Sequence, residues 1–198
     1  MKVLVLKGNL VADANSFSNK VVDYFVDKVE SKYQDAEVEV INLAKTKLAD
    51  VFLTQKSFST YYTDVESAKW IAKMKEVDKV IISVPMINFG PSTIVKNFID
   101  AISVADQTFS YKYSKKGDAI GLLTNIDVTI IASQGAPEGW YSWGNHLGWL
   151  EGTFKFLGAK KVQSLLVAGT KVNLANSLNN GELINEYDNK INSLVENL

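Results

Sequence analysis

The sequence predicts an α/β protein built on a three-layer, doubly wound parallel sheet, and two observations carry this prediction. The first is that short apolar runs typical of buried strands recur along the 198-residue chain; the second is that the segments between them repeat apolar residues at helical spacing. Such alternation implies right-handed crossovers and a five-stranded parallel sheet covered by helices on both faces. The expected strands are residues 2–7, 36–43, 78–84, 127–133 and 160–169. The first, third and fourth are the most apolar, which fits the sheet order 2-1-3-4-5.

Helices are expected between these strands. The first, residues 16–33, opens at Ser16, a residue type that suits an N-cap, and repeats apolar residues at helical spacing. Further helices are expected over residues 50–77 (ambiguous in their first half), 92–103, near 144–157 and from 181 onward. Two aromatic-bearing segments, 108–113 and 119–124, suggest a small excursion. Without repeats or linkers, residues 1–198 are expected to form a single domain.

The composition excludes several classes of protein. Cys is absent, which rules out disulfides, thiolate catalysis and Cys-based metal sites. The net charge of −1 and the pI near 5.9 argue against a nucleic-acid partner. No apolar run approaches the roughly 20 residues needed to cross a bilayer. The first residues do not resemble a secretory leader, so we expect no membrane partner and a cytoplasmic location.

In a doubly wound sheet the ligand crevice lies at the carboxyl ends of the strands where the winding reverses, here between the first and third strands. The loop after the first strand offers Asn9, followed by Ser16, Phe17 and Ser18 at a helix start. A helix N-terminus has unpaired N–H groups that suit a phosphate. All 21 basic residues are Lys, so no guanidinium can hold that phosphate. Taken alone, Ser16 is better explained as an ordinary helix cap.

The loop after the third strand, VPMINFGPS over residues 84–92, is unusually apolar for a connection. It carries Met86, Ile87, Asn88 and Phe89, which suits a flat, largely apolar ligand. Packing of a buried loop against the neighbouring helix explains the same residues about as well. Neither a dinucleotide-binding glycine fingerprint nor a P-loop is present.

A third loop, SQGA, follows the fourth strand and contains Ser133, Gln134, Gly135 and Ala136. With the other two loops it suits flavin mononucleotide (FMN): one phosphate on a helix N-terminus, a tricyclic ring on apolar side chains, and amides at the polar edge of the ring.

The motifs of these loops carry a resemblance to a known family. The segments LVLKGN…SFSN, PMINFGPSTIVKNFID, SQGA and TFSY resemble those of the flavodoxin-like FMN-dependent NADH:quinone oxidoreductases and azoreductases, once labelled acyl carrier protein phosphodiesterases. The resemblance covers essentially the whole chain, and its second motif is quite specific. It implies a flavodoxin-like fold, a homodimer, one bound FMN per subunit and NADH as the electron donor.

The resemblance also assigns roles to residues. It implies that Asn9 and residues 16–18 hold the FMN phosphate, that residues 86–89 line the isoalloxazine ring, and that residues 133–136 reach its polar edge. Phe109 and Tyr111 are expected on the substrate side of the dimeric site.

Four positions depart from the family pattern: Gly8 for Ser, Ile87 for Tyr, Gln134 for Arg and Ala136 for Gly. These changes bear on rate and specificity more than on FMN binding.

The inventory of catalytic side chains is poor, as flavin chemistry allows, because the cofactor itself accepts the electrons. His146 is the only His, so we expect no zinc site and no triad, and we assign it to solvent or to a helix end. The run GWYSWGNHLGW places Trp140, Tyr141, Trp143 and Trp149 after the fourth strand. These aromatics either stack near the flavin or pack in the core or a dimer interface; packing is the more expected for Trp149.

The expected function is two-electron, ping-pong reduction of a quinone or aromatic azo compound by NADH. Two alternatives remain, a flavodoxin-type electron carrier and an NAD(P)H-dependent free-flavin reductase. Carriers of this type tend to be strongly acidic, which the net charge of −1 does not match.

Overall fold

A computed structural model describes residues 1–11, 16–112, 119–175 and 180–198 of the chain. Its centre is a twisted parallel sheet in the order β2-β1-β3-β7-β8, which confirms the predicted order 2-1-3-4-5. The strands are β1 (Lys2–Lys7), β2 (Glu37–Asn42), β3 (Lys79–Ile87), β7 (Asp127–Ser133) and β8 (Lys161–Val167). The short β4 (Gly90–Pro91) pairs antiparallel with the end of β3.

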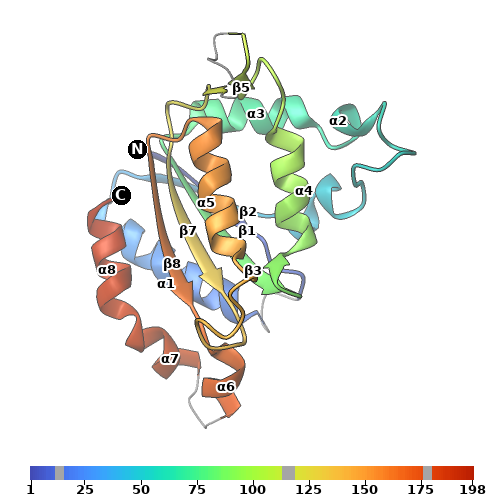
Figure 1. The fold of residues 1–198 in the computed structure, drawn as a ribbon. Coiled ribbons are helices and arrows are strands. Elements are labelled where there is room, and N and C mark those ends of the chain that lie inside the picture. The colour runs from blue at the N-terminus through green and yellow to red at the C-terminus, as the bar shows by residue number, and fades with distance from the viewer. Residues whose placement is uncertain (12–15, 113–118, 176–179) are drawn as a thin grey trace.

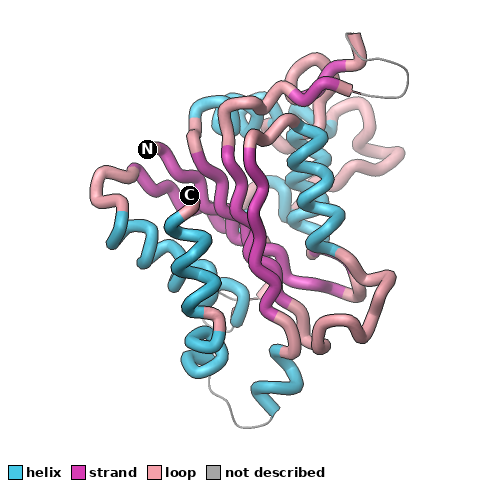
Figure 2. The backbone as a smooth tube through the Cα atoms, turned by 60° about the vertical axis from the view of Figure 1, so that its left-hand side comes forward, coloured by secondary structure: helices cyan, strands magenta, loops and turns pink. Residues whose placement is uncertain are grey.

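Helices cover both faces of the sheet, giving three layers (Figure 1; Figure 2). The structure contains α1 (Phe17–Lys32), α2 (Tyr61–Asp64), α3 (Ser67–Glu76), α4 (Thr93–Ile102), α5 (His146–Leu157), α6 (Thr170–Ala175), α7 (Asn180–Glu186) and α8 (Asp188–Glu196). Two 3₁₀ turns, η2 (Leu43–Lys45) and η3 (Lys47–Ala49), follow β2.

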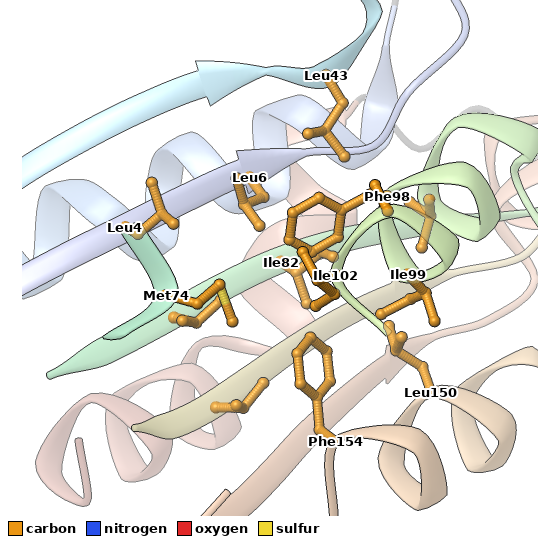
Figure 3. Packing of buried hydrophobic residues seen from close by; sticks show 14 of the residues in the cluster. Leu4, Leu6, Leu43, Met74, Ile82, Phe98, Ile99, Ile102, Leu150 and Phe154 are labelled. Atoms are coloured by element: carbon orange, nitrogen blue, oxygen red, sulfur yellow. The ribbon is translucent and has the colours of Figure 1, made fainter. Parts of the chain in front are cut away.

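The core is divided in two by the sheet. Side chains alternate along each strand, so Leu4 and Leu6 of β1 face one layer while Val3 and Val5 face the other. The first layer packs the strands against α3, α4 and α5, and Phe98 of α4 and Phe154 of α5 belong to the same buried cluster as Ile82 of β3 (Figure 3). The second packs them against α1, α7 and α8. The three central strands are the most buried, as their apolar composition predicts.

The segment 50–77 differs from the expected helix in its first half. Residues 51–60 contain no helix, and helical structure is confined to the single turn of α2 and to α3. The buried Asn97 of α4 explains part of this, because its Nδ2 donates to the carbonyl oxygens of Leu48 and Val51, both at 2.7 Å. These carbonyls are held by a neighbouring element and not by a continuing helix.

The carboxyl-terminal tail also differs in detail. The expected single helix is divided at Tyr187 into α7 and α8, although its apolar stripe still faces the sheet through residues such as Ile184 and Ile191. The short α6 was not predicted. The excursion is confirmed as a two-stranded sheet of β5 (Phe109–Ser110) and β6 (Ile120–Gly121).

This small sheet lies at the amino-terminal edge of the main sheet, as Figure 1 shows. It is held there by the end of α5, because the N–H of Leu123 donates to the carbonyl of Leu157. A Cβ on Gly121 would lie 2.2 Å from the backbone nitrogen of Gly158, so the two backbones touch only because both residues are glycines. In the part of the chain that the structure describes, no helix is long and apolar enough to cross a membrane.

Candidate functional site

Three strand-end segments meet at the carboxyl edge of the sheet. The N–H of Gly8, just after β1, donates to Ser83 Oγ of β3 at 2.9 Å, and the Ser92 hydroxyl donates to the Gly8 carbonyl at 2.6 Å. In the adjoining pair, Pro85 of β3 lies opposite Ser133 of β7. The loops that begin at residues 8, 86 and 133 therefore share one edge, as the switch-point argument predicts.

Gly8 is required by this packing. A Cβ at residue 8 would lie 2.2 Å from Val95 Cγ2 and 2.4 Å from the Ser83 carbonyl oxygen. The Ser that the resemblance implies at this position would not fit the close approach of β1, β3 and α4.

The N-terminus of α1 carries the two predicted hydroxyls. Ser16 has an extended backbone, and its Oγ accepts a hydrogen bond from the N–H of Asn19 at 3.3 Å, which confirms it as the N-cap. Ser16 Oγ also lies 3.1 Å from Ser18 Oγ. Both side chains are buried. Phe17 between them packs against the core layer under α1.

Asn9 is buried, and only one of the two polar atoms of its side-chain amide has a hydrogen-bond partner among the described residues. Its Nδ2 donates to the carbonyl of Val11 at 2.5 Å, whereas its Oδ1 has no hydrogen-bond partner among the described residues. A buried acceptor without a partner is costly and indicates that something outside the described chain supplies a donor.

The loop after β3 is a tight hairpin. Met86 pairs with Pro91 and Ile87 with Gly90, which leaves Asn88 and Phe89 as the two turn residues, with φ of 46° and 72°. Two successive positive φ values are typical of a type I′ turn. Asn tolerates this conformation, but Phe adopts it rarely, and such strain concentrates at functional sites.

The turn presents Phe89 to the aromatic loop after β7. The ring of Phe89 lies edge-to-face with Tyr141 at 5.0 Å between centroids, and Trp143 lies 5.9 Å from Phe89 and 5.5 Å from Tyr141. Trp140 and Trp143 are exposed, whereas Trp149 packs against the core. Packing is therefore confirmed for Trp149, while Tyr141 and Trp143 lie beside the hairpin.

A pocket of about 340 Å³ lies between the hairpin and the loop after β7, a size within the range of small-molecule sites. Most of its wall is apolar or aromatic, and it carries one cation. Its lining residues are Met86, Asn88, Phe89, Gly135, Ala136, Trp140, Tyr141, Lys171 and Val172.

Five of these lining residues were predicted from the motifs. Seven others were predicted for the site but do not line this pocket: Asn9, Ser16, Phe17, Ser18, Ile87, Ser133 and Gln134. Ile87 alternates to the other side of the hairpin, as strand geometry requires. Gln134 is buried, and its Nε2 donates to the carbonyls of Ala136 and Pro137 at 3.0 and 3.2 Å, which shapes the loop from within.

Four lining residues were not assigned to the site by sequence. Trp140 and Tyr141 were noted with two possible roles. Lys171 and Val172 carried no signal, because they follow the fifth strand, outside every motif.

His146 is the first residue of α5, so the helix-end expectation is confirmed, but it is only 2% exposed and the solvent expectation is wrong. Burial, opposed by a backbone hydrogen bond at Val84, lowers the pKa of His146 from 6.5 to about 4. Its Nε2 has no hydrogen-bond partner within the described residues. The side chain is therefore a neutral, buried group at neutral pH.

Phe109 and Tyr111 lie away from this pocket. Phe109 lies in β5 and Tyr111 just after it, at the opposite edge of the main sheet (Figure 1), and their rings meet edge-to-face at 5.4 Å between centroids. A single chain does not bring them to the residues lining the pocket. Over the described residues, no group of three or more His, Asp or Glu side chains is placed to hold a metal ion.

The topology and the position of the pocket define a protein of the flavodoxin-like class, and a family model described as a flavodoxin-like fold matches residues 1–191. An FMN-dependent NADH:quinone oxidoreductase of Mycoplasmopsis synoviae (strain 53) is 53% identical over 173 residues, 87% of each chain. One of the same name from Mycoplasma mobile is 42% identical over 99% of this chain and 98% of its own. The chain therefore belongs to the family of FMN-dependent NADH:quinone oxidoreductases.

Solved structures give the same fold. A crystal structure of an azoreductase from Bacillus anthracis str. Sterne superposes with a TM-score of 0.82 at 16% identity, covering 100% of this chain and 99% of that one. An FMN-dependent NADH-azoreductase from Bacillus anthracis str. Ames Ancestor, solved in complex with FMN, gives 0.80 at 20% identity over 100% and 99% of the two chains.

Proposed function

We propose that the protein is an FMN-dependent oxidoreductase that uses NADH to reduce quinones and aromatic azo compounds by two-electron, ping-pong transfer. One observation carries this proposal. Three loops share one sheet edge, the first two joined by hydrogen bonds and the third through the pairing of β3 with β7, and this edge carries both buried hydroxyls at a helix N-terminus and a pocket walled by apolar and aromatic side chains. The relatives that cover nearly the whole chain, named for FMN, NADH and quinone, support it.

Residues along the carboxyl edge of the sheet suit the phosphate, the ribityl chain and the ring of FMN in turn. The N–H groups that open α1 and the hydroxyls of Ser16 and Ser18 would donate to the phosphate. The Oδ1 of Asn9 is an acceptor, so it suits a ribityl hydroxyl, which can donate, better than a phosphate oxygen, which cannot. This modifies the role that the family resemblance gives to Asn9.

The ring would lie against Met86 and Phe89, and its polar edge would meet Asn88 and the backbone of residues 133–136. When bound, FMN supplies the chemistry, accepting hydride from NADH and passing two electrons to an acceptor. The chain's own part would be to orient the ring and exclude water. Residues such as Met86 and Tyr141, which line the pocket from the hairpin and from the loop after β7, would do both. Without Arg, a 2′-phosphate on the donor would depend on Lys, which favours NADH over NADPH.

We also propose a homodimer, since Phe109 and Tyr111 are placed where only a second copy could bring them to a site. A groove of about 400 Å³ beside α4, lined by Phe52, Leu53, Pro91 and Trp149 among others, supports an interface on that face. Phe52 and Leu53 are exposed apolar side chains in the single chain. Two-fold dimers are the commonest oligomers.

Steady-state kinetics test the function directly. Purified protein loaded with FMN is expected to oxidise NADH with menadione as acceptor and with no partner reductase, giving parallel lines in double-reciprocal plots. Protein that binds FMN but oxidises NADH only through a partner reductase would instead be an electron carrier. Release of reduced flavin as the product would identify a free-flavin reductase.

A further inference from the structure

Lys171 lines the pocket between the hairpin and the loop after β7. This chain has no Arg anywhere, and the loop after β7 carries the uncharged Gln134. Gln134 is turned inward onto the carbonyls of its own loop. Among the described residues that line the pocket, Lys171 is the only one that carries a charge.

The position of Lys171 is fixed by backbone contacts with the loop 134–136. The N–H of Lys171 donates to the Gly135 carbonyl at 3.1 Å, that of Thr170 to the Gln134 carbonyl at 3.1 Å, and that of Gly169 to the Ala136 carbonyl at 2.8 Å. Three consecutive hydrogen bonds dock the segment after β8 on the segment after β7. Lys171 is therefore held beside the loop that is expected to meet the polar edge of the ring.

The side chain of Lys171 crosses Gly135. A Cβ at residue 135 would lie 2.8 Å from Lys171 Cδ and 2.9 Å from its Cγ, so the missing side chain of Gly135 makes room for the lysine stem. The ammonium group forms no ion pair or hydrogen bond with other described residues. An exposed stem packed on a glycine and ending in an unpaired cation suits an anion that is not part of the chain.

We propose that Lys171 stabilises the reduced cofactor in preference to the oxidised one. This inference rests on the proposed function. Hydride transfer from NADH leaves NAD⁺ and adds two electrons and one proton, so the ring gains one negative charge at its pyrimidine side. A cation within a few ångströms of that charge lowers its free energy. Lys171 then raises the midpoint potential of bound FMN and favours reduction by NADH.

The experiment compares the two-electron midpoint potential of bound FMN in the wild type and in Lys171→Met, together with the affinities for oxidised and reduced FMN. Lys171→Met is expected to weaken binding of reduced FMN about tenfold more than that of oxidised FMN, a drop of about 30 mV. Lys171→Arg, which keeps the charge, is expected to retain the wild-type potential. Lys75→Met, which removes an exposed lysine of α3, is the matched control and is expected to change nothing.

A second variant tests the same contact from the other side. Gly135→Ala keeps Lys171 but displaces its stem, and it is expected to lower the potential in the same direction as Lys171→Met. An unchanged potential in Lys171→Met would overturn the assignment. So would an equal loss of affinity for both oxidation states, or a rise in the KM for NADH alone, which would place the cation on the donor.

The two proposals fail in different ways. A wild-type protein that binds no FMN would refute the proposed function and this inference with it. Bound FMN and NADH oxidation in the wild type, with the same potential in Lys171→Met, would refute only the role of Lys171.

Discussion

His146, the only histidine of the chain, is buried at the start of α5, and its pKa is lowered to about 4. An unfolded chain has an ordinary histidine with a pKa of about 6.5 and so binds more protons at acid pH. The free energy of unfolding that this difference contributes is fully present above about pH 6.5 and is lost as the pH falls toward 4.

This linkage gives a prediction for stability. Between pH 7.5 and pH 5 the wild type is expected to lose about 2 kcal/mol more unfolding free energy than His146→Gln, which has no group titrating in this range. Denaturant titrations of both proteins at the two pH values measure the difference. Equal losses in the two proteins would show that His146 is not buried as a neutral group.

Asn88 combines two properties that can be separated by mutation. Its φ of 46° favours Asn or Gly over Ala, and the residue lines the pocket. Asn88→Gly keeps the backbone and removes the amide, whereas Asn88→Ala loses both.

Both variants are expected to bind FMN about tenfold more weakly, which corresponds to the loss of one hydrogen bond. Only Asn88→Ala is expected to lose folding stability, by about 1 kcal/mol. Calorimetric titration with FMN and denaturant unfolding measure the two effects. Wild-type FMN affinity in Asn88→Gly would mean that the amide does not touch the cofactor.

At the scale of elements, the N-terminus of α1 is the part of the candidate site whose local structure the sequence predicts best. Ser16, Ser18 and the apolar spacing of the helix are local signals, and a cap is a local structure. Its counterpart is α5, which is capped by Asn145 through a 2.7 Å hydrogen bond from the N–H of Gly148. Because Ser16 and Asn145 each cap a helix, a variant at Asn145 can serve as the control for a variant at Ser16.

Ser16→Ala is expected to lose about 1 kcal/mol of stability and to bind FMN more weakly while leaving riboflavin affinity unchanged, because riboflavin lacks the phosphate. Asn145→Ala is expected to lose similar stability but to keep the wild-type ratio of FMN to riboflavin affinity. If Ser16→Ala keeps that ratio as well, the phosphate does not lie at the start of α1.

Other elements show where local signals fail. Residues 51–60 were expected to be partly helical, but the buried amide of Asn97 holds the carbonyls of Leu48 and Val51 from a distant helix. Periodicity cannot report a bond between residues almost 50 positions apart. Lys171 was missed for the same reason, since its place beside Gly135 comes from the docking of two loops in the folded chain.

At the scale of the whole molecule, the order of the strands could be predicted from the alternation of strands and helices together with composition, because the strands buried on both faces are the most apolar. The position of Phe109 and Tyr111 did not. Sequence motifs expected them at the site, and a single chain places them at the opposite edge of the sheet (Figure 1). Their proposed role therefore depends on assembly.

Tyr111 is 62% exposed, so Tyr111→Ala is not expected to disturb the fold. It is expected to raise the KM for menadione several-fold in a dimeric protein while the FMN dissociation constant is unchanged. Light scattering gives the mass, expected near twice the 21.9 kDa of one chain. A monomer, or a dimer whose KM for menadione is unaffected by the variant, would remove Tyr111 from the site.

The central claim is that the three strand-end loops form one site for one FMN. Calorimetric titration of FMN into flavin-free protein tests it most directly. We predict saturable binding of one FMN per chain, stronger than that of riboflavin and followed by bleaching of the bound flavin on addition of NADH. Absence of binding, or equal affinity for FMN and riboflavin, would contradict the account.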